Sequence, residues 1–302
     1  MKRITWRKGL LSLLAALCLV LAAASAGAEG CVVNLIDDPD AAYELDPDAE
    51  LLEIVFPAIH GSDACILRMG DETMMIDCST DDQSPLLVVP ALRAMGVTHI
   101  DTAFNSHPHD DHITGFEFLE GTATIGRLLV AFPEDYNYII KRTVRVLSAQ
   151  GVPVEHVEDG DVLHLGQAEL TVFQRKGGDF TVNDLSACIL LRYGERTYIT
   201  LGDVENRGQA ALVSNPPACG MKADIMKYPH HGHVKLNQAF YDLIDPELAI
   251  ITAHQWPAKE GFAFMERQGV PALSTWYGMI RLRTDGHIWV VDYLPENGEE
   301  AP

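Results

Sequence analysis

Histidines are concentrated in two short windows of the chain, and these windows are the first candidates for chemistry. The 302 residues include twelve histidines, and six of them are His107, His109, His112, His230, His231 and His233. Imidazole and carboxylate groups are ligands that a borderline cation such as zinc accepts. The clustering therefore predicts metal binding.

The first window directly follows a predicted strand. The strand is expected over 98–105, a helix over 113–119, and the window between them reads Ser106-His107-Pro108-His109-Asp110-Asp111-His112. Because a strand end fixes the backbone, the first two histidines, with a stiff proline between them, can converge on one ion. Asp111 and His112 then face a second point nearby. The alternative is a solvated polar loop that caps a helix with one aspartate, which needs no histidine.

Apolar runs alternate along the chain with helix-like stretches, and their order predicts the fold class. Strands are expected over 51–59, 64–69, 73–77, 98–105, 170–174, 188–193, 197–201, 223–228, 248–252, 279–283 and 288–293. Helices are expected over 85–95, 113–119, 134–150, 205–214, 236–243 and 258–268. The strands form two groups, each starting with antiparallel hairpins. This predicts one α/β domain over 51–294, with two mixed β-sheets packed together and helices outside.

The motifs taken together resemble those of a known family. The pattern His-x-His-x-Asp-His at 107–112 is the signature of the metallo-β-lactamase-fold hydrolases. The family's other motifs follow in order as Gly61-Ser62-Asp63-Ala64, Met75-Ile76-Asp77, Leu201-Gly202-Asp203 and Tyr228-Pro229-His230-His231-Gly232. With Asn183-Asp184-Leu185-Ser186, the last pattern looks most like the branch that includes the hydrolase domain of the ComEC competence proteins. The resemblance covers roughly 51–293 and implies an αββα sandwich.

The resemblance also implies a site for two divalent metal ions at the edge of the sandwich. The implied ligand sets share one bridging carboxylate: His107 and His109 with Asp203, and Asp111, His112 and His230 with the same Asp203. Zinc is the expected metal and manganese the alternative. A helix cap is the alternative role for Asp203.

Three further residues are expected beside the ligands. Asp77 matches the family's buried aspartate behind the site, and we expect it to orient a histidine. His231 is expected in the same supporting shell. Asn183 stands where many members of the family carry another histidine, so the first ion is expected to have one protein ligand fewer.

Three residues are predicted to take part in the reaction itself. Asp111 would anchor the second ion and accept a hydrogen bond from the attacking hydroxide. His254 follows a predicted strand, as the ligands do, and could donate a proton to the leaving group. His233 could donate a proton or contact an anion, and a plain surface histidine is the alternative.

The expected reaction is hydrolysis by a hydroxide that bridges the two ions, without a covalent enzyme intermediate. The resemblance favours a phosphodiester or phosphate-ester substrate, either a small molecule or a phosphate-bearing polymer, with nuclease action as one version. A lactamase or lactonase is the second prediction among enzymes. An exported, non-catalytic metal-binding accessory protein is the prediction from another class.

The amino-terminal segment has the pattern of a secretory signal peptide. Four basic residues precede an apolar run and a small-residue stretch, so cleavage is expected by residue 28 and secretion follows. A retained membrane anchor is the alternative, and lipid attachment at Cys31 is a minor option. Removing 1–28 leaves 18 basic against 43 acidic residues, a formal charge of −25. Such a surface disfavours long tracking along nucleic acid.

The segments at either end of the predicted domain carry no sustained apolar period. Residues 29–50 are acidic and contain prolines, and we interpret them as a linker or a loosely docked arm. Residues 295–302 are expected to be a tail. Cys65 and Cys188 lie in strand-like runs, where buried thiols are expected rather than a disulfide.

Overall fold

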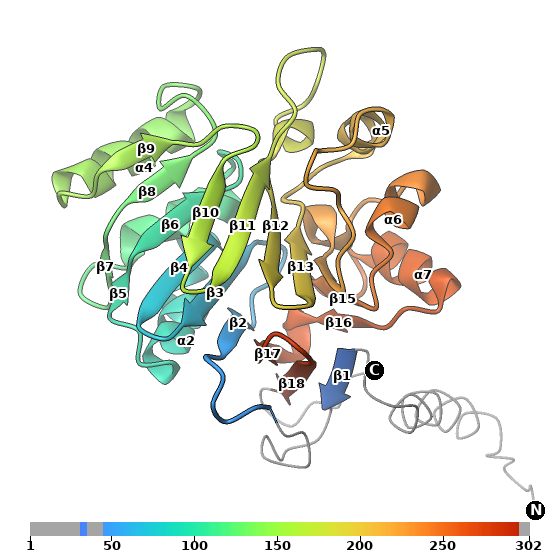
Figure 1. Ribbon diagram of the computed structural model, residues 1–302. Coiled ribbons are helices and arrows are strands. Elements are labelled where there is room, and N and C mark those ends of the chain that lie inside the picture. Colours follow the sequence, from blue (N-terminus) through green and yellow to red (C-terminus); the bar gives the residue numbers. More distant parts are fainter. Residues whose placement is uncertain (1–30, 35–44, 296–302) are drawn as a thin grey trace, which may run out of the picture.

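Two large β-sheets face one another in the computed structural model of the chain, which describes residues 31–34 and 45–295 (Figure 1). The first sheet runs in the order β1 (Cys31–Asn34), β18 (Trp289–Pro295), β17 (Gly278–Thr284), β2 (Leu52–Phe56), β3 (Ala64–Met69), β4 (Glu72–Cys78), β6 (Thr102–Asn105), β8 (Leu128–Val130) and β9 (Val154–His156). The second runs in the order β10 (Val162–Leu165), β11 (Ala168–Phe173), β12 (Cys188–Tyr193), β13 (Arg196–Thr200), β14 (Ile225–Lys227), β15 (Leu248–Ile251) and β16 (Ala272–Ser274). A small pair joins β5 (His99–Ile100) to β7 (Thr124–Ile125).

Helices cover the outer face of each sheet. The described helices are α2 (Val89–Ala94), α3 (Asp110–Ile113), α4 (Tyr138–Ala149), α5 (Asn206–Ser214), α6 (Gln238–Ile244) and α7 (Lys259–Gln268). Figure 1 shows α2 and α4 on the side of the first sheet and α5, α6 and α7 on the side of the second. Short helical turns occupy Ser84–Val88, Thr114–Phe118, Asn183–Leu185, Pro229–Gly232 and Thr275–Tyr277. The predicted αββα sandwich is confirmed.

The alternation of side chains along the strands divides the core into three layers. In β2, Leu52, Ile54 and Phe56 pack between the sheets, whereas Val55 packs under the helices of the first sheet. In β12, Ile189 likewise faces the other sheet. Because successive strand residues point to opposite faces, one run of apolar residues can serve two layers. Both faces of each sheet are therefore buried.

The structure differs from the sequence prediction at the shortest elements. Strands β8, β9 and β10 were not predicted, because runs of three or four residues give little periodicity. Helix α4 was predicted to begin at residue 134 but begins at Tyr138. The side chain of Asn137 accepts a hydrogen bond from the Ile140 amide and caps the helix at that point. Cys65 and Cys188 are buried free thiols.

The predicted signal peptide over 1–28 lies outside the described residues, as does 35–44 of the predicted arm. Within that arm, β1 pairs in parallel with β18. Among the described helices, none has the length and apolar character needed to cross a bilayer.

Parallel strands in both sheets end at the same edge of the sandwich. In the first sheet β4, β6, β8 and β9 are mutually parallel, and in the second β13, β14, β15 and β16 are. The connections that leave their carboxyl ends include every residue of the two histidine windows. Side chains on these connections meet at one edge, which is where ligands bind in open α/β sheets.

One glycine allows the first histidine window to pack closely against the end of β4. A Cβ at Gly115 would lie 1.8 Å from the carbonyl oxygen of Cys78 and 2.7 Å from the Cβ of Ser84. The Gly115 amide donates to Ser79 O at 3.1 Å, so the two segments cannot separate without losing this contact. A side chain here would force the turn that carries His112 away from β4.

We expect Gly115→Ala to lower the free energy of unfolding by about 2–3 kcal/mol, because the added methyl group overlaps backbone atoms. Gly121→Ala is the control, since no atom lies within 4 Å of its added Cβ and only its positive φ opposes the change. We expect about 1 kcal/mol for that variant. Urea unfolding of both variants checks this, and equal losses would contradict the packing argument.

Candidate metal centre

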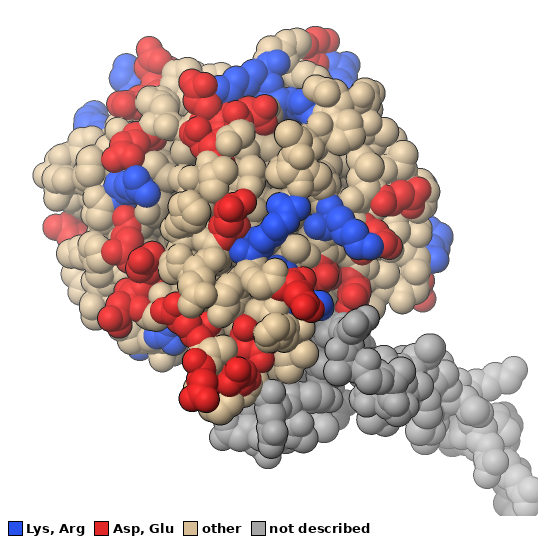
Figure 2. All heavy atoms as spheres, viewed as in Figure 1, with Lys and Arg blue, Asp and Glu red and all other residues tan. Residues whose placement is uncertain are grey.

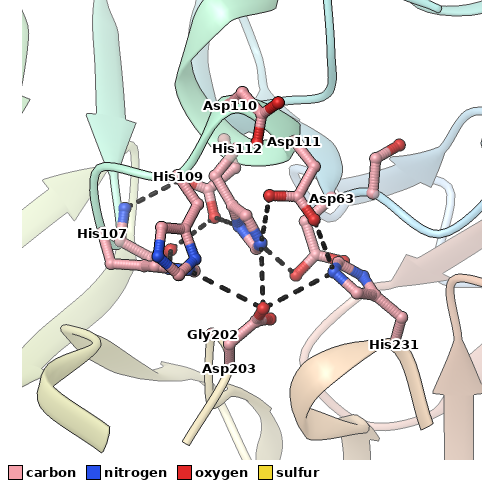
Figure 3. Close-up of polar contacts among 12 residues, drawn as sticks. Asp63, His107, His109, Asp110, Asp111, His112, Gly202, Asp203 and His231 are labelled. Atoms are coloured by element: carbon pink, nitrogen blue, oxygen red, sulfur yellow. Dashed lines mark hydrogen bonds and ion pairs between the residues drawn. The ribbon is translucent and has the colours of Figure 1, made fainter. Parts of the chain in front are cut away.

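The two histidine windows meet at the edge of the sandwich around one carboxylate oxygen. The Oδ2 atom of Asp203 lies 3.7 Å from His107 Nε2, 3.3 Å from His112 Nε2 and 3.5 Å from His231 Nε2. His230 Nε2 is slightly farther from the same oxygen, at 3.9 Å. Figure 3 shows His107, His112 and His231 directed toward Asp203 from three sides. The fold therefore brings together residues that lie more than a hundred positions apart in the sequence.

A glycine lets Asp203 reach this position. Gly202 has φ +50, and a Cβ there would lie 2.6 Å from the Cβ of Ser186. The amide of Asp203 donates to Ser186 Oγ at 3.1 Å. The turn after β13 can therefore press against its neighbour, which places the aspartate side chain at the centre of the histidines.

Asp77 orients two histidines of the first window. Its Oδ2 accepts a hydrogen bond from His112 Nδ1 at 2.8 Å and another from Ser106 Oγ at 2.6 Å. Because the Ser106 hydroxyl donates to Asp77, it can accept from His107 Nδ1, 3.1 Å away. These bonds hold a proton on Nδ1 of each imidazole, so that Nε2, which faces Asp203, is the nitrogen left for a metal ion. This is the orienting position that the sequence analysis gave to Asp77.

His109 lies beside His107 on the more open side of the cluster. Its Nδ1 is 3.1 Å from His107 Nε2, and its side chain is partly exposed. A cation between these two nitrogens would also face Asp203. The structure thus brings together the three residues expected to hold the first ion.

The second window is arranged differently from the prediction. His230 and His231 have φ values of 50° and 52°, so the chain turns sharply and directs the two rings to different places. His231 is buried, and its Nε2 lies 3.2 Å from Asp111 Oδ2. The Nδ1 atom of His230 lies 3.0 Å from Glu205 Oε1. His231, expected in a supporting shell, therefore occupies the position beside Asp111 that was expected for His230.

Asp63 orients His231 and was missing from the predicted site. Its Oδ1 accepts from His231 Nδ1 at 3.0 Å and from Thr252 Oγ1 at 2.6 Å. Asp63, His112, Asp203 and His231 form one buried group whose potential ligand atoms lie within 4.8 Å of one another. The only signal in the sequence was the motif Gly61-Ser62-Asp63-Ala64, which matched the family without indicating a role.

Carboxylates and imidazoles in this cluster shift one another's protonation. Burial alone would lower the pKa of His112 and of His231, but Asp203 and its neighbours outweigh burial, so the pKa of His112 lies well above its usual value and that of His231 rises to about 9. For His107, burial and the charge of His112 together hold the pKa well below its usual value. Without a cation, protons on His112 and His231 offset the negative charge of Asp203.

The three remaining predicted residues lie at the margin of the cluster. Asn183 Nδ2 donates to Glu205 Oε1 at 3.0 Å, so it reaches the ligands only through that side chain. The ring centroid of His233 lies 5.5 Å from that of His230 and 5.7 Å from that of His231. Burial and the neighbouring His231 and His230 lower the pKa of His233.

His254 is turned toward aromatic side chains. Its ring centroid lies 4.6 Å from that of Trp276, and its Nδ1 accepts a hydrogen bond from the Trp256 amide at 3.1 Å. Among the described contacts, none joins His254 to the metal-ligand cluster. Its role as a proton donor stays a prediction.

The donor set fits divalent metal ions. His112 Nε2 and Asp203 Oδ1 are buried and have no hydrogen-bond partner, although buried polar atoms are normally paired. Imidazole nitrogens and carboxylates at this spacing are the ligands of zinc and of similar ions. One ion would bind to His107, His109 and Asp203, and a second to Asp111, His112, His231 and Asp203.

Comparison with known proteins agrees with the motif-based resemblance. The sequence model of the metallo-beta-lactamase superfamily matches residues 60–254. The chain is 26% identical over 201 residues to ComE operon protein 3 of Bacillus subtilis (strain 168), a match that takes in 63% of this chain and 25% of that protein. The chain thus spans about a quarter of the length of this relative.

Solved structures with the same fold include two that cover most of the chain. A mutant of the CmlA beta-hydroxylase, an enzyme of Streptomyces venezuelae, has a TM-score of 0.53 and 16% identity over 80% of this chain and 55% of its own. The metallo-beta-lactamase fold protein YhfI from Bacillus subtilis has a TM-score of 0.50 and 11% identity over 76% of this chain and 99% of its own. At these identities the likeness concerns the fold alone.

Loss of the orienting carboxylate should weaken metal binding without unfolding the protein. We expect Asp77→Asn to lower zinc affinity about 10–100-fold, because an amide cannot accept hydrogen bonds at both of its terminal atoms. Competition with a chromogenic chelator measures this. Asp101→Asn is the control, since Asp101 accepts from the Thr73 amide at the opposite ends of the same strands. Equal affinities in both variants would contradict the orienting role.

The two adjacent histidines can be told apart by metal binding. We expect His231→Ala to cost at least about tenfold more in affinity for the second ion than His230→Ala, because only His231 faces Asp111. Metal content per chain after dialysis and titration of metal-free protein provide the measurement. A larger loss in His230→Ala would restore the original assignment from the sequence.

Proposed function

Because the chain belongs to the metallo-β-lactamase superfamily, we propose that it is a hydrolase that uses two divalent ions to cleave a phosphoester. The observation that carries this proposal is the convergence of His107, His112 and His231 on one oxygen of Asp203. An aspartate that faces ligands on both sides can be shared by two cations. Zinc is the metal we propose, with manganese as the alternative to be tested.

When bound, the two ions supply a water of lowered pKa and Lewis-acid polarisation of the ester. The protein's side chains would hold the ions and orient the groups around them. Among the proposed ligands of the second ion, Asp111 has an exposed portion, since its side chain is 27% exposed while that of His112 is buried. Burial would raise the pKa of Asp111, but His112 and His231 hold it well below its usual value, so the carboxylate stays ionised and can accept a hydrogen bond from the attacking water. We propose His233 as an anion contact near the open side, through a ring N–H, rather than as a proton donor, because burial lowers its pKa.

A cavity of about 430 Å³, lined by residues that follow β8, β9 and β11, offers room for a substrate. Tyr136, Arg175 and Lys176 are among its lining residues. Asn137, which follows Tyr136 in the chain, donates from Nδ2 at 2.9 Å to the carbonyl of Pro108. Because Pro108 separates His107 from His109, this bond links the cavity wall to the metal centre. The two basic side chains outnumber the one acidic lining residue, Glu158, so the lining favours an anionic occupant. We therefore place the part of the substrate beyond the scissile ester in this cavity.

The surface charge narrows the choice among phosphoesters. On the face drawn in Figure 2, acidic side chains are widely spread, and Lys and Arg gather in smaller groups at the upper margin and near the centre. Such a surface disfavours long contacts with a polyanion. A short phosphodiester or a terminal phosphate ester fits better than a nucleic acid duplex.

We propose that the protein acts outside the cytoplasm. The support is the signal-like sequence over 1–28, with its basic residues followed by an apolar run and small residues. Expression of the full chain with recovery from the external or periplasmic fraction tests this. Recovery of the protein from the cytoplasmic fraction alone, with residues 1–28 still attached, would overturn it.

An activity panel decides the proposed function. The metal-loaded chain should hydrolyse bis(p-nitrophenyl) phosphate, while a chromogenic lactam should remain unchanged. His109→Ala and Asp203→Ala should lower kcat/KM by about a thousandfold or more, because each removes an ion ligand. His99→Ala is the matched control, since His99 contacts Thr124 away from the site. Turnover of the lactam but of no phosphoester would replace the proposal with the lactamase alternative.

The same activity panel tests whether the substrate occupies the cavity. Lys176→Ala should raise KM for an anionic ester severalfold and leave kcat nearly the same, because the lysine lines the cavity and not the metal centre. An unchanged KM would remove the substrate from this cavity while leaving the hydrolase proposal in place.

A further inference from the structure

A buried lysine lies directly behind the candidate metal centre. Lys227 is the last residue of β14 and is 2% exposed. Its Nζ donates to Asp63 Oδ2 and to the carbonyl of Gly202 at 3.1 Å, and lies 3.9 Å from Asp203 Oδ1. Lysine is seldom fully buried, because removal of its ammonium group from water is costly unless specific partners compensate. The contacts of Lys227 therefore require an explanation.

The lysine completes the hydrogen bonds of Asp63. Oδ2 of that aspartate accepts from Lys227, and Oδ1 accepts from His231 Nδ1 and Thr252 Oγ1. Both of its oxygens are taken, although the side chain lies within reach of the metal-ligand group.

We propose that Lys227 is a positioning residue that keeps Asp63 out of the metal's coordination shell and commits it to orienting His231. This inference rests on the proposed metal centre. Without Lys227, Oδ2 of Asp63 would lose its hydrogen-bond donor and would be free to bind a cation, because a buried carboxylate oxygen needs a compensating partner. The lysine removes that option and so fixes the number of protein ligands on the second ion.

The surroundings of the lysine leave little freedom for other arrangements. A cavity of about 10 Å³, room for no more than one water molecule, is lined by Lys227, Asp63, Asp77 and Thr252. The bond from Lys227 to the Gly202 carbonyl also ties the end of β14 to the turn that carries Asp203.

Cobalt(II) provides a test that does not depend on any substrate. The metal-free full-length chain is titrated with Co²⁺, whose visible absorption weakens when coordination rises from four ligands to five or six. We expect Lys227→Met to show bands at least about twofold weaker per bound ion than the wild type, because the released Asp63 becomes an additional ligand. Asp63→Asn/Lys227→Met should restore the wild-type intensity, since asparagine still accepts from His231 but does not replace a carboxylate ligand.

Controls separate this effect from a loss of folding. Lys222→Met removes an exposed lysine paired with Asp245 and should leave the spectrum unchanged. If Lys227→Met does not fold, the double variant, which buries no unpaired charge, decides the matter by its band intensity. A wild-type spectrum in folded Lys227→Met, or weakened bands in the double variant, would overturn the positioning role. A wild-type chain that binds no cobalt would instead overturn the metal centre on which the inference rests.

Discussion

Four carboxylates in one buried region set the main physical constraint on this structure. Asp63, Asp77 and Asp203 are almost fully buried, and Asp111 lies beside them. Such charges are stable away from water only when cations or hydrogen-bond donors compensate each of them. Lys227 and the histidines provide this compensation in the described chain, and metal ions fit the atoms that remain unpaired. The site is therefore an electrostatic unit in which each side chain depends on the others.

Within this unit the aspartates divide into two roles. Asp77 and Asp63 each bind the Nδ1 of one histidine, His112 and His231 respectively, from behind. Asp203 faces the opposite nitrogens of the same two rings. Asp77 thus fixes the ring of His112, and Asp63 fixes the ring of His231. Asp203 would bind the same ion as these two rings. Both orienting aspartates lie in or directly before a strand of the first sheet, although His112 follows a strand of that sheet and His231 follows a strand of the second.

The sequence predicted the sandwich and the first histidine window because both depend on local patterns. Alternating apolar runs identify strands, and the spacing from His107 to His112 reports ligands that one turn can present. Asp63 and Lys227 could not be assigned in the same way. An acidic residue after a turn and a lysine at a strand end are ordinary surface features until the two sheets bring them together. Long-range packing is what converts them into a buried pair.

The order of His230 and His231 shows a second limit of local reasoning. Both are adjacent histidines in one motif, so only the backbone decides which ring turns inward. Two successive residues in the left-handed region make that decision, and non-glycine residues seldom adopt such a conformation. The strain is stored at the site itself, where it serves to place a ligand.

The ligands come from both halves of the sandwich, since the first window follows β6 and Asp203 follows β13. An ion bound between them would act as a cross-link across the open edge of the molecule. Its binding energy would add to the cohesion of the two sheets, so retention of metal and resistance to unfolding would rise and fall together. In an environment that removes metal, this edge would be the first part of the molecule to loosen, and loss of catalysis would precede loss of the fold.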